Sequence, residues 1–257
     1  MHVAMLFRSM LAMLLLAPAV AAWGQAGVPM LPPRCEAPAG LALVPRGFSR
    51  TAAELAAGSL VRIAVLGSGS SAGNGVSVPA NAYPAAFKRY LQQSYPDGAF
   101  EVSTFAQRGA RVADMLARLE NDVLPWQPAL VVWQIGISDV VETVPLSRFR
   151  RDLDRGMKLL RAAGADLLFI DMQYSRYTEL LVSPGEYLEQ LRWISRRQRV
   201  ALLRRYAMME HWIGSGAFDF EGRTPSEQHR DADAAHDCIG GWLARMVRQG
   251  VLLANKR

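Results

Sequence analysis

Short apolar segments alternate along the chain with segments of helical spacing, and this alternation restricts the fold more than any other feature. The predicted strands cover residues 62–66, 100–106, 129–135, 166–170 and 200–203. The predicted helices cover residues 51–58, 84–95, 112–124, 149–163, 187–197 and 238–253. Such a pattern indicates a parallel sheet covered on both faces, which binds ligands at the carboxyl ends of its strands. We therefore expect a ligand site in the loops after residues 66, 106 and 135 and before the last helix.

The first 22 residues have the pattern of a signal peptide. Arg8 precedes an almost wholly apolar run over residues 10–20, and small residues surround a predicted cleavage point near Ala22, with a second option after Ala26. The run is about half of the ~20 residues that a membrane-spanning helix needs. We therefore favour export to the periplasm or medium over an uncleaved anchor, and we expect no stable membrane insertion. An N-terminal arm, residues 23–58, and an α/β domain, residues 59–257, follow.

The chain has two cysteines, Cys35 and Cys238, and the expected export would allow them to form a disulfide. Disulfides form and persist in oxidising compartments. We therefore favour a disulfide, which would tie the N-terminal arm to the last helix, over two free thiols.

The net charge of +6 is concentrated in a run of arginines around residues 192–205. A basic patch can bind nucleic acid or acidic polymers. These arginines flank a helix-to-strand junction, so a solvated helix face is the favoured interpretation. We expect no nucleic-acid partner, and an anionic envelope polysaccharide is the weaker alternative.

The loop after the first predicted strand is rich in glycine and serine, with the sequence GSGSSAGNG at residues 67–75. It could cradle a phosphate, present a serine nucleophile or form a tight turn. The lysine of a P-loop is missing, and Ala72 stands where the third glycine of a dinucleotide-binding motif would be. We therefore disfavour nucleotide binding and expect no cofactor.

Four blocks in this order resemble the SGNH (GDSL-type) esterases over roughly residues 35–253. They are IAVLGSGSSAG (63–73), GARVADML (109–116), VVWQIGISD (131–139) and SEQH (226–229). The resemblance implies a three-layer α/β sandwich with a parallel, flavodoxin-like five-stranded sheet. It also implies a serine nucleophile, a histidine base and oxyanion donors, which together perform acyl transfer.

Several catalytic positions of the resemblance are altered. The nucleophile position falls on Gly69, between Ser68 and Ser70; Ser71 fits only if Gly67 and Gly73 lose their matches. The family's Gly-x-Asn ends in Ser138, and its Asp-x-x-His begins with Ser226. The candidate catalytic residues are therefore Ser70 and His229, and the oxyanion donors Gly109 and Ser138.

A second acid–base pair, Asp233 and His236, has the Asp-x-x-His spacing, although it falls close to the last helix. The alternative for His229 is a surface histidine on a polar loop, and for His236 a non-catalytic role is favoured. No pair of residues has the spacing of a metal site, so we expect none.

Two hypotheses follow from the altered blocks. In the first, the protein is a slow esterase or deacylase of small acyl esters, such as O-acetyl groups on envelope glycans. In the second, it is an inactive descendant that binds a glycan or a protein partner. The sequence leaves both open, together with the oligomeric state.

Overall fold

The computed structural model describes residues 27–220 and 224–256. The predicted signal peptide, residues 1–22, lies outside the described residues.

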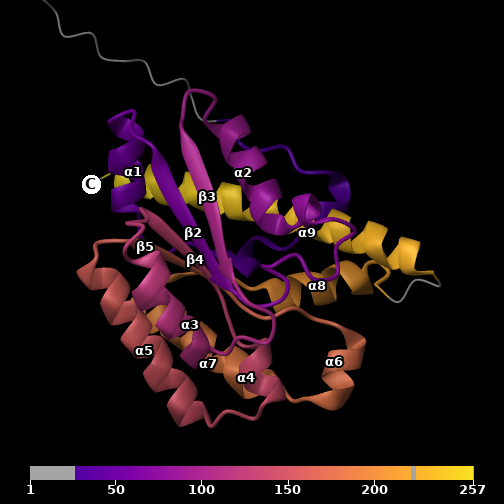
Figure 1. Cartoon of the computed structure of the whole chain (residues 1–257). Coiled ribbons are helices and arrows are strands. Elements are labelled where there is room, and N and C mark those ends of the chain that lie inside the picture. Colours follow the sequence, from indigo (N-terminus) through magenta and orange to yellow (C-terminus); the bar gives the residue numbers. More distant parts are fainter. Residues whose placement is uncertain (1–26, 221–223, 257) are drawn as a thin grey trace, which may run out of the picture.

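A six-stranded sheet forms the centre of the molecule, in the order β1-β6-β5-β4-β2-β3 (Figure 1). The strands are β1 (Ala42–Leu43), β2 (Val61–Gly67), β3 (Phe100–Ala106), β4 (Leu130–Gln134), β5 (Asp166–Ile170) and β6 (Ala201–Leu203). Strands β2 to β6 are parallel and keep the flavodoxin-like order, which confirms the predicted fold class. β2, β4 and β6 are buried over almost their whole length, as expected for strands covered on both faces.

Helices cover both faces of the sheet. They are α1 (Ser49–Ala56), α2 (Tyr83–Ser94), α3 (Val112–Arg118), α4 (Ile137–Val141), α5 (Leu146–Ala162), α6 (Arg176–Leu181), α7 (Gly185–Gln198), α8 (Arg205–Gly214) and α9 (Pro225–Ala254). α2 packs along α9 on one face, and α3, α5 and α7 cover the other (Figure 1). One turn of π-helix, Leu119–Val123, continues α3. None of the helices in the described ranges is both long and apolar enough to cross a membrane.

The N-terminal arm is part of the sheet, which the sequence did not indicate. Ala42 and Leu43 pair antiparallel with β6 and form its edge strand. α1 begins at Ser49, two residues before the predicted start of this helix at residue 51. The backbone N–H and the hydroxyl of Thr51 both donate to Asp166 Oδ2, at 2.9 and 2.8 Å. Thr51 therefore anchors α1 to the start of β5.

The last helix begins thirteen residues earlier than predicted, at Pro225 instead of 238. Its start has the features of a helix N-terminus: Thr224 is the N-cap, Pro225 occupies the first turn, and Glu227 closes a capping box. The segment around His229 is consequently helical and not a loop, and His236 lies within the same helix.

The predicted disulfide between Cys35 and Cys238 is confirmed. It joins residues 203 positions apart and fixes the arm to the middle of α9. The indole N–H of Trp242 also donates to the carbonyl of Cys35 at 2.8 Å, and Arg245 donates to the carbonyl of Pro29. The arm and α9 are therefore one packed unit.

Candidate functional site

The first part of the loop after β2, residues 68–71, buries its three serines. Ser68, Ser70 and Ser71 are 3%, 7% and 2% exposed, whereas Gly69, at the nucleophile position of the resemblance, is partly exposed. A nucleophile must be reachable by its substrate. The nucleophile position of the resemblance therefore carries no side chain, and the neighbouring serine side chains are buried.

Gln134, at the end of β4, holds this loop. Its Oε1 accepts from the backbone N–H of Ser68 at 3.0 Å and from the hydroxyls of Ser68 and Ser71 at 3.2 and 3.1 Å. The oxygen of Tyr83 lies 2.5 Å from Ser71 Oγ. Because the proton of Ser71 is directed at Gln134, Tyr83 donates to Ser71. The hydroxyl proton of Ser71 is thus committed to an amide oxygen, which is not a base.

Ser70 faces a cation. Arg205, the first residue of α8, donates from Nη1 to Ser70 Oγ at 2.7 Å. Its guanidinium is fully buried, which lowers its pKa to about 10, so it remains charged at neutral pH. The nearby Asp171 is also buried, and burial raises the pKa of its carboxyl to about 7 despite a hydrogen bond from the Tyr206 amide. Among the described residues, nothing within hydrogen-bond distance accepts the proton of Ser70.

His236 lies behind the loop, on the inner face of α9. Its Nδ1 accepts from the backbone N–H of Tyr83 at 3.0 Å, and the centroids of the His236 and Tyr83 rings are 5.8 Å apart. A neutral imidazole has one donor and one acceptor, so the proton is on Nε2. Burial, with the neighbouring charge of Arg205, lowers the pKa of His236 to about 3. In a serine hydrolase Nδ1–H donates a hydrogen bond to the orienting carboxylate, and the unprotonated Nε2 takes the proton of the nucleophile. His236 has the opposite arrangement.

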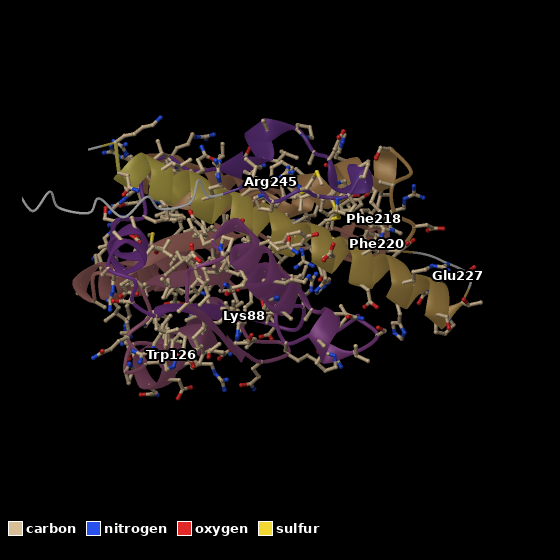
Figure 2. All side chains as sticks on the ribbon, turned by 90° about the horizontal axis from the view of Figure 1, so that it is seen from above. Lys88, Trp126, Phe218, Phe220, Glu227 and Arg245 are labelled. Atoms are coloured by element: carbon tan, nitrogen blue, oxygen red, sulfur yellow. A yellow bond between two sulfur atoms is a disulfide. The ribbon has the colours of Figure 1, made fainter. Side chains whose placement is uncertain are left out.

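His229 lies on the outer side of α9, in what we call the α9 groove. This groove of about 540 Å³ runs between the first half of α9, α2 and the loop after β2. Its polar and charged lining comprises Arg34, Ser77, Asn81, Arg89, Ser226, His229, Arg230, Asp233 and Asp237. At this end α9 extends past the sheet, and Figure 2 shows Glu227 at the outer end of the helix.

Asp233 connects the groove to the loop after β2. It accepts from the N–H and hydroxyl of Ser77, at 2.8 and 2.6 Å, and from Asn81 at 2.9 Å. Burial opposes the charged form, but these hydrogen bonds dominate and hold the pKa of Asp233 below its usual value. Asp233 therefore orders the loop as a carboxylate. No hydrogen bond joins it to either histidine in the described part of the chain.

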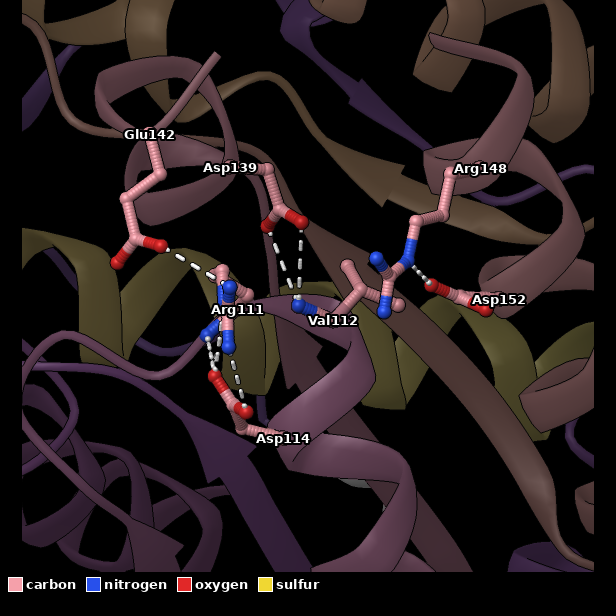
Figure 3. Close-up of polar contacts among 7 residues, drawn as sticks. All are labelled: Arg111, Val112, Asp114, Asp139, Glu142, Arg148 and Asp152. Carbon is pink, nitrogen blue, oxygen red and sulfur yellow. Dashed lines mark hydrogen bonds and ion pairs between the residues drawn. The ribbon is translucent and has the colours of Figure 1, made fainter. Parts of the chain in front are cut away.

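The two predicted oxyanion donors, Gly109 and Ser138, are on chain segments that a hydrogen bond connects. Gly109 has a left-handed backbone, with φ of 77°, directly before α3. Ser138 is in the first turn of α4, which follows Gly136. The buried Asp139 accepts from the Val112 N–H at 3.2 and 3.3 Å, which joins α4 to the start of α3 (Figure 3). Burial raises the pKa of Asp139 to about 7, against that hydrogen bond.

Arg111 reinforces the same junction from outside. It forms ion pairs with Asp114 at 3.0 Å and with Glu142 at 3.0 Å, so it bridges α3 and α4 (Figure 3). Over residues 27–220 and 224–256, neither the amide of Gly109 nor the hydroxyl of Ser138 has a hydrogen-bond partner. Both donors remain available to a ligand.

The structure thus groups the predicted residues in three places. The buried polar cluster contains Ser68, Ser70, Ser71 and His236; Gly109 and Ser138 are at the junction of α3 and α4; His229 and Asp233 line the α9 groove. Sequence reasoning missed Gln134, Tyr83 and Arg205. Only Gln134 gave a signal, as a polar residue inside an apolar strand. No group of three or more acidic, histidine or cysteine side chains in the described residues is arranged to hold a metal ion.

Comparison with known proteins agrees with this architecture. The profile of the non-GDSL lipase-like family matches residues 34–253. A two-domain esterase active on acetylated mannans, crystallised with mannopentaose, is similar over 84% of this chain, with a TM-score of 0.66 and 17% identity. The present chain spans only 57% of that protein.

Two further structures cover most of their own length. A catalytic mutant of an acetylxylan esterase from Geobacillus stearothermophilus has a TM-score of 0.57 and 17% identity, over 73% of this chain and 94% of that one. A protein of Desulfitobacterium hafniense DCB-2 ascribed to the lipolytic G-D-S-L family has a TM-score of 0.55 and 16% identity, over 72% and 99%. At such identity the similarity establishes the shared fold. None of the curated proteins matches the sequence.

Proposed function

We propose that this chain, which belongs to the non-GDSL lipase-like family and has the fold of the SGNH-type esterases, binds a glycan but does not hydrolyse it through a serine nucleophile. The observation that carries this proposal is the loop after β2. Gly69 occupies the accessible nucleophile position, and the three serines beside it are buried and hydrogen-bonded away from both histidines.

The α9 groove is the proposed binding surface. Polyols are bound by convergent hydrogen-bond donors and acceptors, and the groove provides carboxylate, amide, hydroxyl, imidazole and guanidinium groups from three elements. Asp233 holds Ser77 and Asn81 in place before any ligand arrives. Such preorganisation reduces the entropy that binding costs. The similar esterases act on acetylated mannans and xylan, which supports a glycan as the ligand.

A slow esterase is the second candidate, and one observation favours it. The amide of Gly109 and the hydroxyl of Ser138 are free donors on neighbouring loops, as an oxyanion site requires. Ser70 would then be the nucleophile, with His229 as base, after a rearrangement that releases Ser70 from Arg205. A small acyl ester, such as an O-acetyl group on a glycan, would be the substrate.

We also place the protein in the periplasm or outside the cell, as a mature chain that begins near residue 23. The disulfide between Cys35 and Cys238 supports this location, because such bonds persist in oxidising compartments. Detection of the mature protein with an N-terminus at Trp23 or Gly27, by mass spectrometry of a periplasmic extract, tests it.

Titration calorimetry with acetylated and deacetylated manno-oligosaccharides tests the binding proposal. Arg89→Ala and His229→Ala should weaken binding at least about tenfold, or ~1.4 kcal/mol. Lys88→Ala, an exposed cation beside Arg89 that does not line the groove, is the matched control and should bind like the wild type. Absence of binding in the wild type would overturn the proposal.

Fluorophosphonate labelling, followed by peptide mapping, separates the two candidates. We expect no adduct under conditions that label an active esterase fully. A stoichiometric adduct on Ser70 or Ser71 that disappears in His229→Ala would instead establish the slow esterase.

A further inference from the structure

A second cavity lies at the opposite end of the sheet, where β5 and β6 begin. It has a volume of about 280 Å³ and is lined by residues of α1, the end of α5 and the end of α7. The loops after β2, β3 and β4 begin at the carboxyl ends of the parallel strands, at the opposite end of the sheet. This cavity is therefore separate from the positions of the family resemblance and from the α9 groove.

Four arginines line the cavity: Arg46, Arg50, Arg161 and Arg199. The acidic residue that lines it is Asp166, whose Oδ2 already accepts from the amide and hydroxyl of Thr51. Phe48, Met157 and Leu160 provide an apolar wall. The lining is consequently positive, with an apolar surface on which the body of a small ligand can pack.

Two of the four arginines, Arg161 and Arg199, bind neutral acceptors and no carboxylate among the described residues. Arg161 donates to the carbonyl and side-chain oxygen of Gln198, at 3.3 and 2.9 Å, and Arg199 donates to the carbonyl of Pro45 at 2.9 Å. These neutral acceptors orient the guanidinium groups and leave their charge uncompensated. Arg50 is paired with Glu54 and also donates to the carbonyl of Ala163 at 3.0 Å. Arg46 has no hydrogen-bond partner in the described residues, but its charge interacts with the nearby Asp166.

Arg199 also has a backbone that favours glycine. It follows the last residue of α7 with φ of 54° and ψ of 43°, where helices commonly place glycine. Strained residues of this kind occur preferentially at ligand sites. The side chain of Arg199 donates to the Pro45 carbonyl and lines the cavity.

We propose that this cavity binds a small ligand through a carboxylate or phosphate group. The guanidinium fork matches both oxyanions with two parallel hydrogen bonds, and its charge strengthens them. The small volume favours a single sugar or a similar small molecule over a polymer. The alternative is that the arginines serve only to cap the carbonyls at the ends of α5 and α7. That alternative predicts no ligand.

Titration calorimetry on the mature protein, with glucuronate, glucose 6-phosphate, inorganic phosphate and glucose, tests the proposal. At least one oxyanion should bind saturably, and glucose should not. Binding of glucuronate or glucose 6-phosphate, but not of inorganic phosphate, would identify an acidic sugar. Equal binding of inorganic phosphate would identify a bare anion site.

Charge-removing variants locate the site. Arg161→Gln and Arg46→Gln should each weaken binding at least about fivefold, whereas Arg151→Gln, an exposed arginine of α5 outside the cavity, should leave it unchanged. Arg46→Gln removes no hydrogen bond of the described residues, and unchanged urea unfolding of this variant would separate lost binding from a folding defect. Absence of binding by all three anions, or equal losses in Arg151→Gln and Arg161→Gln, would overturn the proposal.

Discussion

The ring of His236 and the backbone of Tyr83 are joined by a hydrogen bond of 3.0 Å, in which Nδ1 accepts the Tyr83 N–H. The bond fixes α9 to the start of α2 and keeps the imidazole neutral and buried. The burial of this ring shapes how the stability of the protein responds to acid.

His236 should make the protein less stable as the pH falls. Its pKa is about 3 in the folded protein, against 6.5 for the free side chain, because the ring is buried. The unfolded chain therefore binds more protons between these values. The stabilisation is complete above pH 6.5 and is lost as the pH falls towards 3, by an amount of at most about 4–5 kcal/mol.

His236→Asn tests this effect, because asparagine keeps an acceptor near the position of Nδ1 but does not titrate. Urea unfolding of wild type and variant between pH 4 and 7 should show a flatter profile for the variant. Parallel profiles would contradict a neutral, buried His236.

Asp139 should act in the opposite direction. Burial raises the pKa of its carboxyl to about 7, from 3.8, so the folded protein binds more protons between these values. Its contribution is present below pH 3.8 and is lost as the pH rises through 7. Asp139→Asn, which keeps an acceptor for the Val112 amide, should reduce the loss of stability between pH 5 and 8. Asp154→Asn, at an exposed position of α5, serves as a control and should not change this loss.

Gly69→Ser should fold but should not become an esterase. An added side chain meets the end of the flexible Asn74 side chain at 3.0 Å, which can move aside. A serine there still needs a base, but His236 has its proton on Nε2 and His229 lines the α9 groove. Hydrolysis of p-nitrophenyl acetate should stay at the level of the wild type. A rise of about tenfold that depends on His229 would show that the base is within reach.

Loss of the disulfide should destabilise the protein substantially. The bond closes a loop between residues 203 positions apart, and removal of a native disulfide typically costs about 2–5 kcal/mol. The double variant Cys35→Ser/Cys238→Ser should therefore unfold at lower urea concentration than the wild type. Dithiothreitol should lower the midpoint of the wild type towards that of the variant and leave the variant unchanged. Equal midpoints in oxidised wild type and variant would contradict the prediction.

Gly240 permits the close packing of α9 on α2. A Cβ at this position would lie 2.6 Å from Ala86 Cβ and from the Phe87 backbone nitrogen. Gly240→Ala should therefore cost about 1–3 kcal/mol, measured by thermal or urea unfolding. Gly185→Ala is the matched control, since a Cβ at Gly185 meets nothing within 4 Å on α7. It should be neutral or stabilising by up to about 1 kcal/mol, and an equal loss in both variants would argue against specific packing at Gly240.

The sequence by itself determined the layered fold. Apolar runs and helical periodicity are local properties, and the five parallel strands lie within one or two residues of their predicted places. Given the expectation of export, the pairing of the two cysteines needed no more than their number. The start of α9 was also present in the sequence as Thr224, Pro225 and Glu227, although the polar composition of that segment suggested a loop.

Only the tertiary structure decided what the serines can do. Arg205 reaches Ser70 from 135 positions away, and His236 reaches Tyr83 from 153, so no local pattern could reveal either contact. The same applies to Arg46, Arg161 and Arg199, which meet only because β5 and β6 begin at one end of the sheet. Periodicity determines which face of an element is buried, but the partner on that face depends on how distant segments pack together.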